Sequence, residues 1–361
     1  MSSSYKLPRL RFPEFTDKWQ ATKLDDLLKI GSGRDFRHLS KGNIPVYGTG
    51  GLMLYVNDYL YDGKSICIGR KGTINKPQFL NGKFWTVDTL FYTHDYRNSV
   101  PEFLYLIFQK INWLQHNEAS GVPSLSKTTI EKIKVTIPSM QEQKKIAEFM
   151  AAVDDKCNVL QQKINLLKKY KKGVMQRIFS QKIRFKDENG NNYPTWQTKK
   201  LGDIAKIKTG GLNVEDAQDD GKYMFFDRSE TIKKYNEYSY DNEALIYAGE
   251  GSEFLPRYYK GKYGLHQRAY TVFNANGVII KFLYYFMLTQ NSYFIRMAVG
   301  STVKSLRMDC FTKCVIPILV DEEQQKIANF LTVLDDKIKL EESKLEQAKN
   351  LKKALLQQMF V

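Results

Sequence analysis

The chain has 361 residues, 42% of them hydrophobic and 13% aromatic, which is enough for two or three domains with cores of their own. This composition excludes a largely disordered chain. Its 55 Lys and Arg residues outnumber its 39 Asp and Glu residues by 16. An excess of this size indicates a polyanionic partner, and nucleic acid is the leading candidate. The alternative is a generically basic surface without such a partner.

The sequence has no feature of a secreted or membrane protein. Residues 1–15 lack the apolar stretch of a signal peptide, and the longest apolar run, residues 282–288, is too short to cross a bilayer. The four cysteines match no zinc-binding spacing. We therefore expect no membrane partner and no metal, and free, mostly buried thiols in a reducing cytoplasm, at Cys67, Cys157, Cys310 and Cys314.

The chain contains an internal repeat, and its first block opens each half. Residues 19–27 (WQATKLDDL) return as residues 196–204 (WQTKKLGDI), a shift of 177 positions (196 − 19). At the same shift, Ile30 and Gly33 return as Ile207 and Gly210. Such self-similarity indicates two copies of one structural unit.

A second repeated block closes each half. Residues 137–156 and 316–337 both begin with Ile-Pro, continue with Glu-Gln-x-Lys-Ile-Ala and reach Asp-Asp-Lys, with a shift of 181 (327 − 146). Between the blocks, residues 34–120 and 211–300 resemble each other only faintly. Two domains with a shared framework and different interiors suit the recognition of two different targets.

The interiors consist of short apolar runs broken by Gly, Asn and Asp turns, and each contains one helix-like stretch, at residues 101–115 and 281–297. We therefore expect a mixed α/β (α+β) fold with strongly twisted sheets. The expected organisation is two globular α/β domains separated by two long helices and related by a pseudo-two-fold internal repeat. The predicted boundaries are 1–138 and 183–318 for the domains, and 139–182 and 319–361 for the helices.

Both helices show the heptad spacing of a coiled coil over about five heptads, without an internal proline. The alternative is a pair of ordinary amphipathic surface helices. Lys171, Lys352 and Glu341 interrupt the apolar pattern as register-setting residues do. The positions predicted to form the seam are Ile146, Val153, Leu160, Ile164, Leu167 and Lys171 in the first helix, and Ile327, Leu334, Ile338, Glu341, Leu345 and Lys352 in the second.

If the two helices pair, we expect them to run antiparallel, because the second then leads back toward the first domain. A helix of about 33 residues spans roughly 50 Å, at about 1.5 Å per residue. That length corresponds to about one to one and a half turns of DNA. Such helices would act as a spacer that sets the distance between two half-sites.

Basic and hydroxyl residues expected on turns are the candidate DNA contacts, because Lys and Arg bind phosphates and Arg also pairs with guanine. Residues 68–73 could equally be a simple hairpin turn, and the hydroxyl-rich loops 121–127 and 300–307 could equally cap helices. The candidates in the first domain are Arg34, Arg37, Lys41, Arg70, Lys71, Thr73, Lys76, Ser124 and Lys127. Those in the second are Lys208, Arg228, Arg257, Lys260, Arg268, Lys304 and Arg307, with Lys233, Lys234 and Lys262 nearby in sequence.

The motifs of the relevant enzymes are missing. The sequence contains no phosphate-binding Walker loop and no Asn/Asp-Pro-Pro-Tyr/Phe motif, with which adenine methyltransferases hold a flipped base. The histidines are scattered, and no nuclease-like cluster of carboxylates and lysine stands out. We expect no catalytic residue and no cofactor in this chain.

The order domain–helix–domain–helix resembles the specificity subunit of Type I restriction–modification enzymes over nearly the whole chain. The resemblance rests on residues 19–27, on residues 189–196 (NGNNYPTW) with residues 201–204 (LGDI), and on the two closing blocks. It implies two target-recognition domains, each binding one half of a bipartite, asymmetric site in double-stranded DNA. The domain interiors, where the family itself varies, leave the recognised bases open.

The resemblance also implies partners. Two modification subunits would carry S-adenosylmethionine and methylate adenine, and two restriction subunits would use ATP and Mg to cut DNA. Two alternatives remain: a self-contained modifying enzyme, which the missing motifs disfavour, and a structural coiled-coil adaptor whose charge is incidental.

Overall fold

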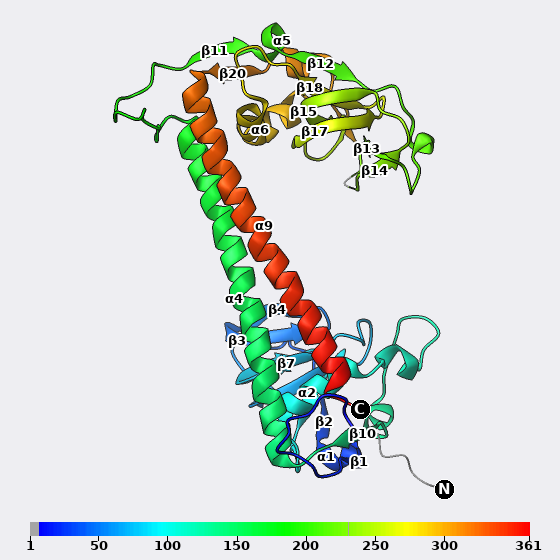
Figure 1. The fold of residues 1–361 in the computed structure, drawn as a ribbon. Coiled ribbons are helices and arrows are strands. Elements are labelled where there is room, and N and C mark those ends of the chain that lie inside the picture. Colours follow the sequence, from blue (N-terminus) through cyan, green and yellow to red (C-terminus); the bar gives the residue numbers. More distant parts are fainter. Residues whose placement is uncertain (1–6, 230) are drawn as a thin grey trace. The chain divides into compact units, whose positions relative to one another are not determined.

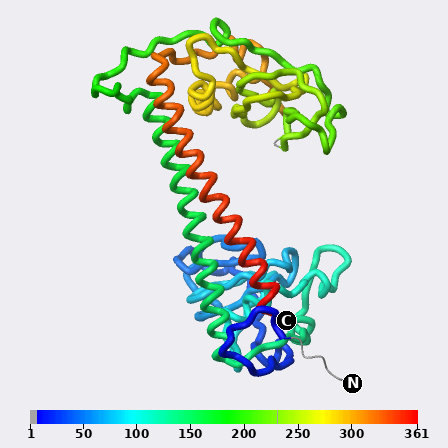
Figure 2. Tube along the Cα trace, viewed as in Figure 1, coloured from blue at the N-terminus to red at the C-terminus, as the bar shows by residue number. Residues whose placement is uncertain are grey.

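The structure, a computed structural model, describes residues 7–229 and 231–361 (Figure 1). The chain divides into two compact units. The first unit comprises Met1–Gln161 and Ser343–Val361, and the second comprises Gln162–Glu342. The long helices α4 (Met140–Phe179) and α9 (Asp321–Gln358) each contribute to both units, as the chain trace in Figure 2 shows.

The first unit contains two four-stranded sheets, with the orders β2-β9-β6-β7 and β4-β3-β8-β5, and the two-stranded ribbon β1-β10. All neighbours are antiparallel except β3 and β8. The strands are β1 (Gln20–Lys23), β2 (Lys29–Ser32), β3 (Lys41–Gly48), β4 (Gly51–Val56), β5 (Tyr61–Asp62), β6 (Ser65–Gly69), β7 (Gln78–Leu80), β8 (Lys83–Thr86), β9 (Leu90–His94) and β10 (Lys134–Ile137).

Short helices connect these strands: α1 (Leu24–Leu27), α2 (Pro101–Lys110), the 3₁₀ turn η1 (Trp113–His116) and α3 (Lys127–Glu131). The main core joins α2 to the long helices, with Phe103 stacked on Phe360 at 5.3 Å between ring centroids. A smaller core, which includes Val46, Phe84 and Trp85, forms between strands of the two sheets. Leu355 in the last turn of α9 and Phe360 just after the helix thus belong to the core of the first unit.

The second unit is built on one six-stranded sheet, with the order β12-β18-β15-β17-β13-β14, and the ribbons β11-β20 and β16-β19. Its strands are β11 (Gln197–Lys200), β12 (Lys206–Thr209), β13 (Tyr223–Phe226), β14 (Lys233–Tyr235), β15 (Tyr240–Ala248), β16 (Glu250–Gly251), β17 (Arg257–Leu265), β18 (Ala269–Phe273), β19 (Lys304–Ser305) and β20 (Val315–Ile318). Its shorter helical segments are α5 (Leu201–Ile204), η2 (Val214–Asp216), α6 (Ile280–Leu288), α7 (Asn291–Met297) and α8 (Met308–Thr312).

The repeat is visible in the framework of the two units. In the first unit β1 pairs with β10, with Gln20 opposite Ile137, and in the second β11 pairs with β20, with Gln197 opposite Ile318. A short helix follows the opening strand in both units, and a long helix follows the closing strand. The expectation of a mixed α/β fold in two repeated domains is confirmed.

Two predicted helical stretches differ from the observed ones. The stretch 101–115 ends as an α-helix at Lys110 and resumes as the 3₁₀ turn η1. The stretch 281–297 is broken between α6 and α7, where Thr289 turns its hydroxyl back to the carbonyl of Phe286. A hydroxyl that bonds to the preceding turn competes with helix continuation, and hydrophobic periodicity does not register such a break.

The two long helices have 40 residues in α4 and 38 in α9, so they lie within the predicted bounds 139–182 and 319–361 and are longer than the stretch of about 33 residues used for the spacing estimate. Within the second unit, Lys163 bonds to Glu341 at 2.8 Å and Lys171 to Asp335 at 2.5 Å. Numbering rises on α4 as it falls on α9, so the paired segments run antiparallel. Every predicted seam position is buried or half-buried.

Candidate nucleic-acid interface

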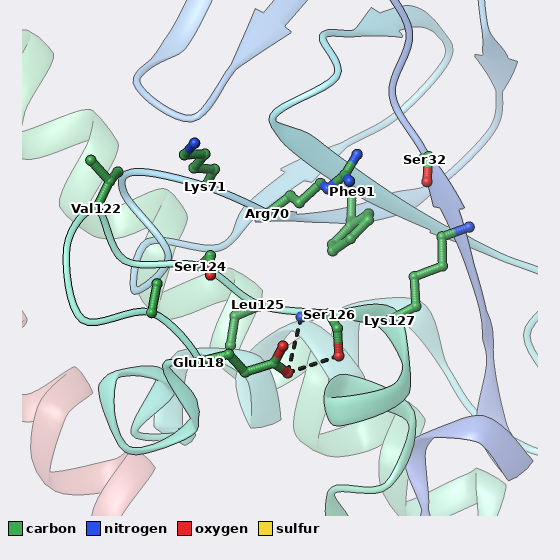
Figure 3. Close-up of a pocket in the computed structure, with 11 residues that line it drawn as sticks. Ser32, Arg70, Lys71, Phe91, Glu118, Val122, Ser124, Leu125, Ser126 and Lys127 are labelled. Atoms are coloured by element: carbon green, nitrogen blue, oxygen red, sulfur yellow. Dashed lines mark hydrogen bonds between the residues drawn. The ribbon is translucent and has the colours of Figure 1, made fainter.

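The first unit carries an open cavity of about 680 Å³ at the end of β6. Arg70 and Lys71 line it from the turn that follows β6, and Lys127 lines it from the start of α3 (Figure 3). Ser32 and Phe91 contribute from β2 and β9, and the Arg70 guanidinium carbon lies 5.9 Å from the centre of the Phe91 ring. The cavity therefore combines three cations with an aromatic face.

Two loops that were separate candidates in the sequence meet at this cavity. The backbone N–H of Arg70 donates to the carbonyl of Thr89 at 2.8 Å, and the carbonyl of Arg70 accepts from the N–H of Leu125 at 2.9 Å. Loop 68–73 is thus tied to loop 121–127 by the main chain. Loop 68–73 also connects β6 to β7, so it is a hairpin connection as well as a cavity wall.

Glu118 is the acidic residue of this cavity, and its carboxylate has its own partners. It accepts hydrogen bonds from the hydroxyls of Thr129 and Ser126, and these bonds lower the pKa of the Glu118 carboxyl. Within the residues that the structure describes, Arg70, Lys71 and Lys127 form no ion pair. The three cations are therefore available to an anionic ligand.

The second unit repeats this arrangement of the backbone. The N–H of Gly249 donates to the carbonyl of Arg268 at 2.8 Å, and the carbonyl of Gly249 accepts from the N–H of Leu306 at 2.7 Å. Gly249 therefore stands where Arg70 stands in the first unit, and Arg268 stands where Thr89 does. The side chains at equivalent places are chemically different.

The residue after each of these positions is also equivalent. Lys71 forms an isolated β-bridge with Ser124, and Glu250 pairs with Ser305 in the ribbon β16-β19. We call this set of backbone contacts the turn frame. It comprises residues 70, 71, 89, 124 and 125 in the first unit and residues 249, 250, 268, 305 and 306 in the second.

In the second unit, the carboxylate of the turn frame holds two arginines. Glu250 accepts from Nη1 of Arg228 at 2.9 Å on one oxygen and from Nη1 of Arg268 at 2.8 Å on the other. The bond from Arg228, followed by the charge of Arg268, lowers the pKa of the Glu250 carboxyl. Both arginine side chains are more than half exposed.

The expectation that the basic candidates lie on turns is correct for only part of them. Arg34, Arg37, Lys76, Arg228 and Arg268 follow it. Several others belong to strands, because Gly and Asn turn signals in the sequence do not mark where each strand begins and ends. These are Lys41 in β3, Lys208 in β12, Lys233 and Lys234 in β14, Arg257, Lys260 and Lys262 in β17, and Lys304 in β19.

Some candidates have structural partners. Lys304 donates from Nζ to the carbonyl of Ile295 at 2.8 Å, and Arg257 donates to the carbonyl of Ser229 at 2.6 Å. In the hydroxyl-rich loop of the first unit, Ser126 accepts from the N–H of Thr129, so helix capping is correct for that residue. Thr73, Ser124 and Lys127 are half-buried, while Lys208, Lys260 and Arg307 are exposed.

The Glu-Gln pair of each closing block has a role that the sequence analysis missed. The buried carboxylate of Glu142 accepts from the Trp19 indole at 3.2 Å and from two nitrogens of Arg11 at 2.7 Å each. Glu323 repeats these contacts with Trp196 at 2.8 Å and Arg184 at 3.1 and 2.7 Å. The shared Arg-Phe that precedes each tryptophan (residues 11–12 and 184–185) was the available signal.

The neighbouring glutamines are equivalent as well. Gln143 accepts from the N–H of Val100 at 2.9 Å, and Gln324 accepts from that of Ile279 at 2.7 Å. Val100 and Ile279 each stand directly before a helix of the domain interior, α2 and α6 respectively. The repeated Glu-Gln therefore fastens the start of each long helix to its own domain.

Other kinds of site are not found in the part of the chain that the structure describes. No group of three or more His, Cys, Asp or Glu residues there could hold a metal ion. No helix within residues 7–229 and 231–361 combines the length and apolar character that crossing a bilayer requires. Cys67, Cys310 and Cys314 are buried, and Cys157 is half-buried.

Known proteins resemble this chain along most of its length. The sequence profile described as "Type I restriction modification DNA specificity domain" matches residues 16–169 and 193–350. The chain belongs to this family of Type I restriction–modification specificity subunits, which confirms the resemblance noted in the sequence.

Individual relatives differ in how much of them is aligned. The EcoDI specificity subunit of Escherichia coli is 31% identical over 154 residues, which cover 42% of this chain and 34% of that protein. The MjaVIII specificity subunit of Methanocaldococcus jannaschii is 22% identical over 96% of this chain and 92% of its own length. The crystal structure of a specificity subunit from M. genitalium shares the fold, with a TM-score of 0.68, 14% identity and 99% of both chains covered.

Proposed function

We propose that this chain is a non-catalytic DNA-recognition subunit in which each unit binds one half of a bipartite, asymmetric site. The turn frame is the observation that carries the proposal. The same backbone bonds present Arg70 and Lys71 in the first unit but Gly249 and Glu250 in the second. One framework with two sets of side chains suits two half-sites of different sequence.

The charge of the chain supports DNA as the ligand. The net charge is +16, and three cationic side chains that form no ion pair among the described residues line the cavity of the first unit. The sequence candidates on turns and strands remain proposed contacts to phosphates and bases. We infer that the chain acts in the cytoplasm, where it would meet DNA.

Exposed apolar side chains on the long helices support docking of two copies of a partner. Val159 and Leu340 are equivalent under the shift of 181 and are 62% and 54% exposed. Tyr170 and Leu351 are equivalent in the same way, and both are 54% exposed. Each unit therefore presents the same pair of apolar positions, as two identical partner subunits would require.

We infer that these partners are two adenine methyltransferase subunits, which would bring S-adenosylmethionine, and that two restriction subunits would join them with ATP and Mg. One solved structure of similar fold, with a TM-score of 0.53, concerns complex assembly of the Type I restriction–modification system. Recruitment of these subunits to DNA would make this chain the source of sequence specificity for methylation and cleavage.

Mapping methylated adenines in cells with and without this chain tests the proposal. We expect one bipartite motif to lose its methylation when the chain is absent. Binding of the reconstituted methyltransferase complex to that motif should weaken steeply as salt rises. An unchanged methylation map, or salt-insensitive binding, would favour the structural adaptor. Tight S-adenosylmethionine binding by the isolated chain would favour the modifying enzyme.

A matched deletion tests the proposed spacer role of α4 and α9. Removal of residues 155–161 and 344–350 shortens both helices by a heptad, while Asp154–Lys352 and Lys171–Asp335 stay in place. We expect the mapped motif to keep both half-sites and change only the number of bases between them. Altered half-sites would contradict the spacer role.

A further inference from the structure

We propose that Arg228 and Arg268 recognise guanine in the half-site bound by the second unit, with Glu250 as the positioning residue that holds both. This inference rests on the proposed DNA-binding function and adds the chemistry of one half-site. The three residues come from different segments of the second unit: Arg228 follows β13, Glu250 lies in β16, and Arg268 lies in the turn between β17 and β18. The fold therefore brings them together.

The carboxylate of Glu250 is fixed before any ligand binds. The backbone of Glu250 pairs with Ser305 in β16-β19, and the preceding Gly249 is bonded to both Arg268 and Leu306. The Glu250 side chain is only 17% exposed and uses one carboxylate oxygen for each guanidinium. Arginines held in this way lose less conformational entropy on binding than free ones do.

Each guanidinium keeps donors for a ligand. Arg228 and Arg268 use only Nη1 for Glu250, and neither forms another side-chain hydrogen bond within the residues that the structure describes. The Nε and Nη2 donors of each remain, on side chains 56% and 60% exposed. Two parallel N–H groups on a rigid plane match the O6 and N7 acceptors of guanine in the major groove.

The charge of the cluster favours a base over a phosphate. Glu250 cancels one of the two arginine charges and would itself repel a phosphate at this place. The first unit differs, because Arg70, Lys71 and Lys127 line its cavity without an ion pair among the described residues. The Arg–Glu–Arg cluster thus suits recognition of a base edge, in contrast to the unpaired cations of the first unit.

Charge-conserving variants in the reconstituted methyltransferase complex test the inference. Arg228→Lys and Arg268→Lys keep the charge but remove the two-pronged donor. We expect each to reduce discrimination for the G·C pair in the second half-site by about tenfold or more. Affinity for DNA without the site should change by less than about threefold, because phosphate attraction is retained. Arg296→Lys, at an exposed position of α7 in the same unit, is the matched control and should change neither quantity.

The role of Glu250 as a positioning residue has its own readout. Glu250→Gln should reduce discrimination at the same base pair, leave the melting curve and the first half-site unchanged, and add little once both arginines are lysines. Glu250→Asp, which keeps the carboxylate, should restore part of the discrimination. If Glu250→Gln acts equally strongly in the double-lysine background, Glu250 does not act through the arginines, and that part of the inference fails.

Selection of bound or methylated sites from a randomised DNA library gives all base preferences at once. A second half-site without a G·C pair, or unchanged preferences in both lysine variants, would overturn the guanine inference and leave the proposed function intact. Absence of any motif that depends on this chain would instead remove the proposed function itself.

Discussion

Lys171 of α4 forms an ion pair with Asp335 of α9, with 2.5 Å between Nζ and Oδ1. Under the shift of 181 the equivalent residues are Lys352 and Asp154, and they form the same pair at 2.6 Å with the helices exchanged. Tyr285 extends the first pair, because its hydroxyl donates to Asp335 at 2.8 Å and its ring lies 5.0 Å from the Lys171 ammonium. Each unit thus closes its helix pair with the same ion pair.

The ion pair between Lys171 and Asp335 should contribute more to stability than the exposed pair between Lys168 and Glu342 of the same helices. Its side chains are 13% and 26% exposed, whereas those of Lys168 and Glu342 are 57% and 45% exposed. In double-mutant cycles to alanine we expect a coupling of about 1–3 kcal/mol for Lys171 and Asp335. We expect about 0.5 kcal/mol or less for the exposed pair. Hydrogen exchange of α4 amides gives both values, and equal couplings would contradict the prediction.

Arg11→Ala should destabilise the first unit by about 3 kcal/mol, because it leaves the buried carboxylate of Glu142 with only the Trp19 indole. Urea unfolding followed by tryptophan fluorescence, to which Trp19, Trp85 and Trp113 of the first unit contribute, measures the effect. The exposed Arg9→Ala is the matched control and should change stability by less than about 0.5 kcal/mol. An equal effect of the two variants would show that the Glu142 contacts are dispensable.

The two repeated glycines should not tolerate a side chain. A Cβ on Gly33 would lie 1.9 Å from the carbonyl oxygen of Val87, and one on Gly210 would lie 1.8 Å from that of Leu265. Gly33→Ala and Gly210→Ala should each cost about 1–3 kcal/mol, each in its own unit. Gly211→Ala is the control, since its Cβ would meet no atom within 4 Å. Limited proteolysis with mapping of the cleaved unit distinguishes the two; the prediction is wrong if Gly211→Ala is as sensitive.

Thiol chemistry should separate the cysteines by burial. Burial raises the pKa of Cys67 to about 12 and that of Cys314 to about 12, so both thiols stay neutral at pH 8–9. A disulfide reagent should label half-buried Cys157 in the folded protein and reach the other two only after unfolding. Because the unfolded pKa is about 8.5, the stability that these thiols contribute is complete below that pH and falls as pH rises toward 12. Rapid labelling of Cys67 at pH 8 in folded protein would contradict this.

Much of the framework could be predicted because it is encoded locally. The periodicity after Pro138 and Pro317 predicts two long helices, and the repeated blocks predict that the halves share strands and short helices. Helix ends and strand bounds in the interiors were less predictable. The break at Thr289 depends on one hydroxyl, and the placement of Arg257 and Lys260 in β17 depends on pairing with β15.

The turn frame could not be predicted from local sequence patterns. Loops 68–73 and 121–127 were identified separately, but their main-chain contact joins segments more than 50 residues apart in the sequence. The equivalence of Lys71 and Glu250 was likewise hidden, because the interiors have no common residue shift through which to align them. Side-chain patterns do not report backbone bonds of this kind.

The sequence by itself determined the duplicated framework, the long helices and the family, because repeat spacing, heptad periodicity and motif order are properties of the linear chain. The tertiary structure alone decided which side chains share a surface. It placed Glu250 between Arg228 and Arg268, and it buried Glu142 and Glu323 against their tryptophans. Hydrogen bonds and ion pairs act over a few ångströms in space, and residues far apart in the chain reach that distance only when the fold has formed.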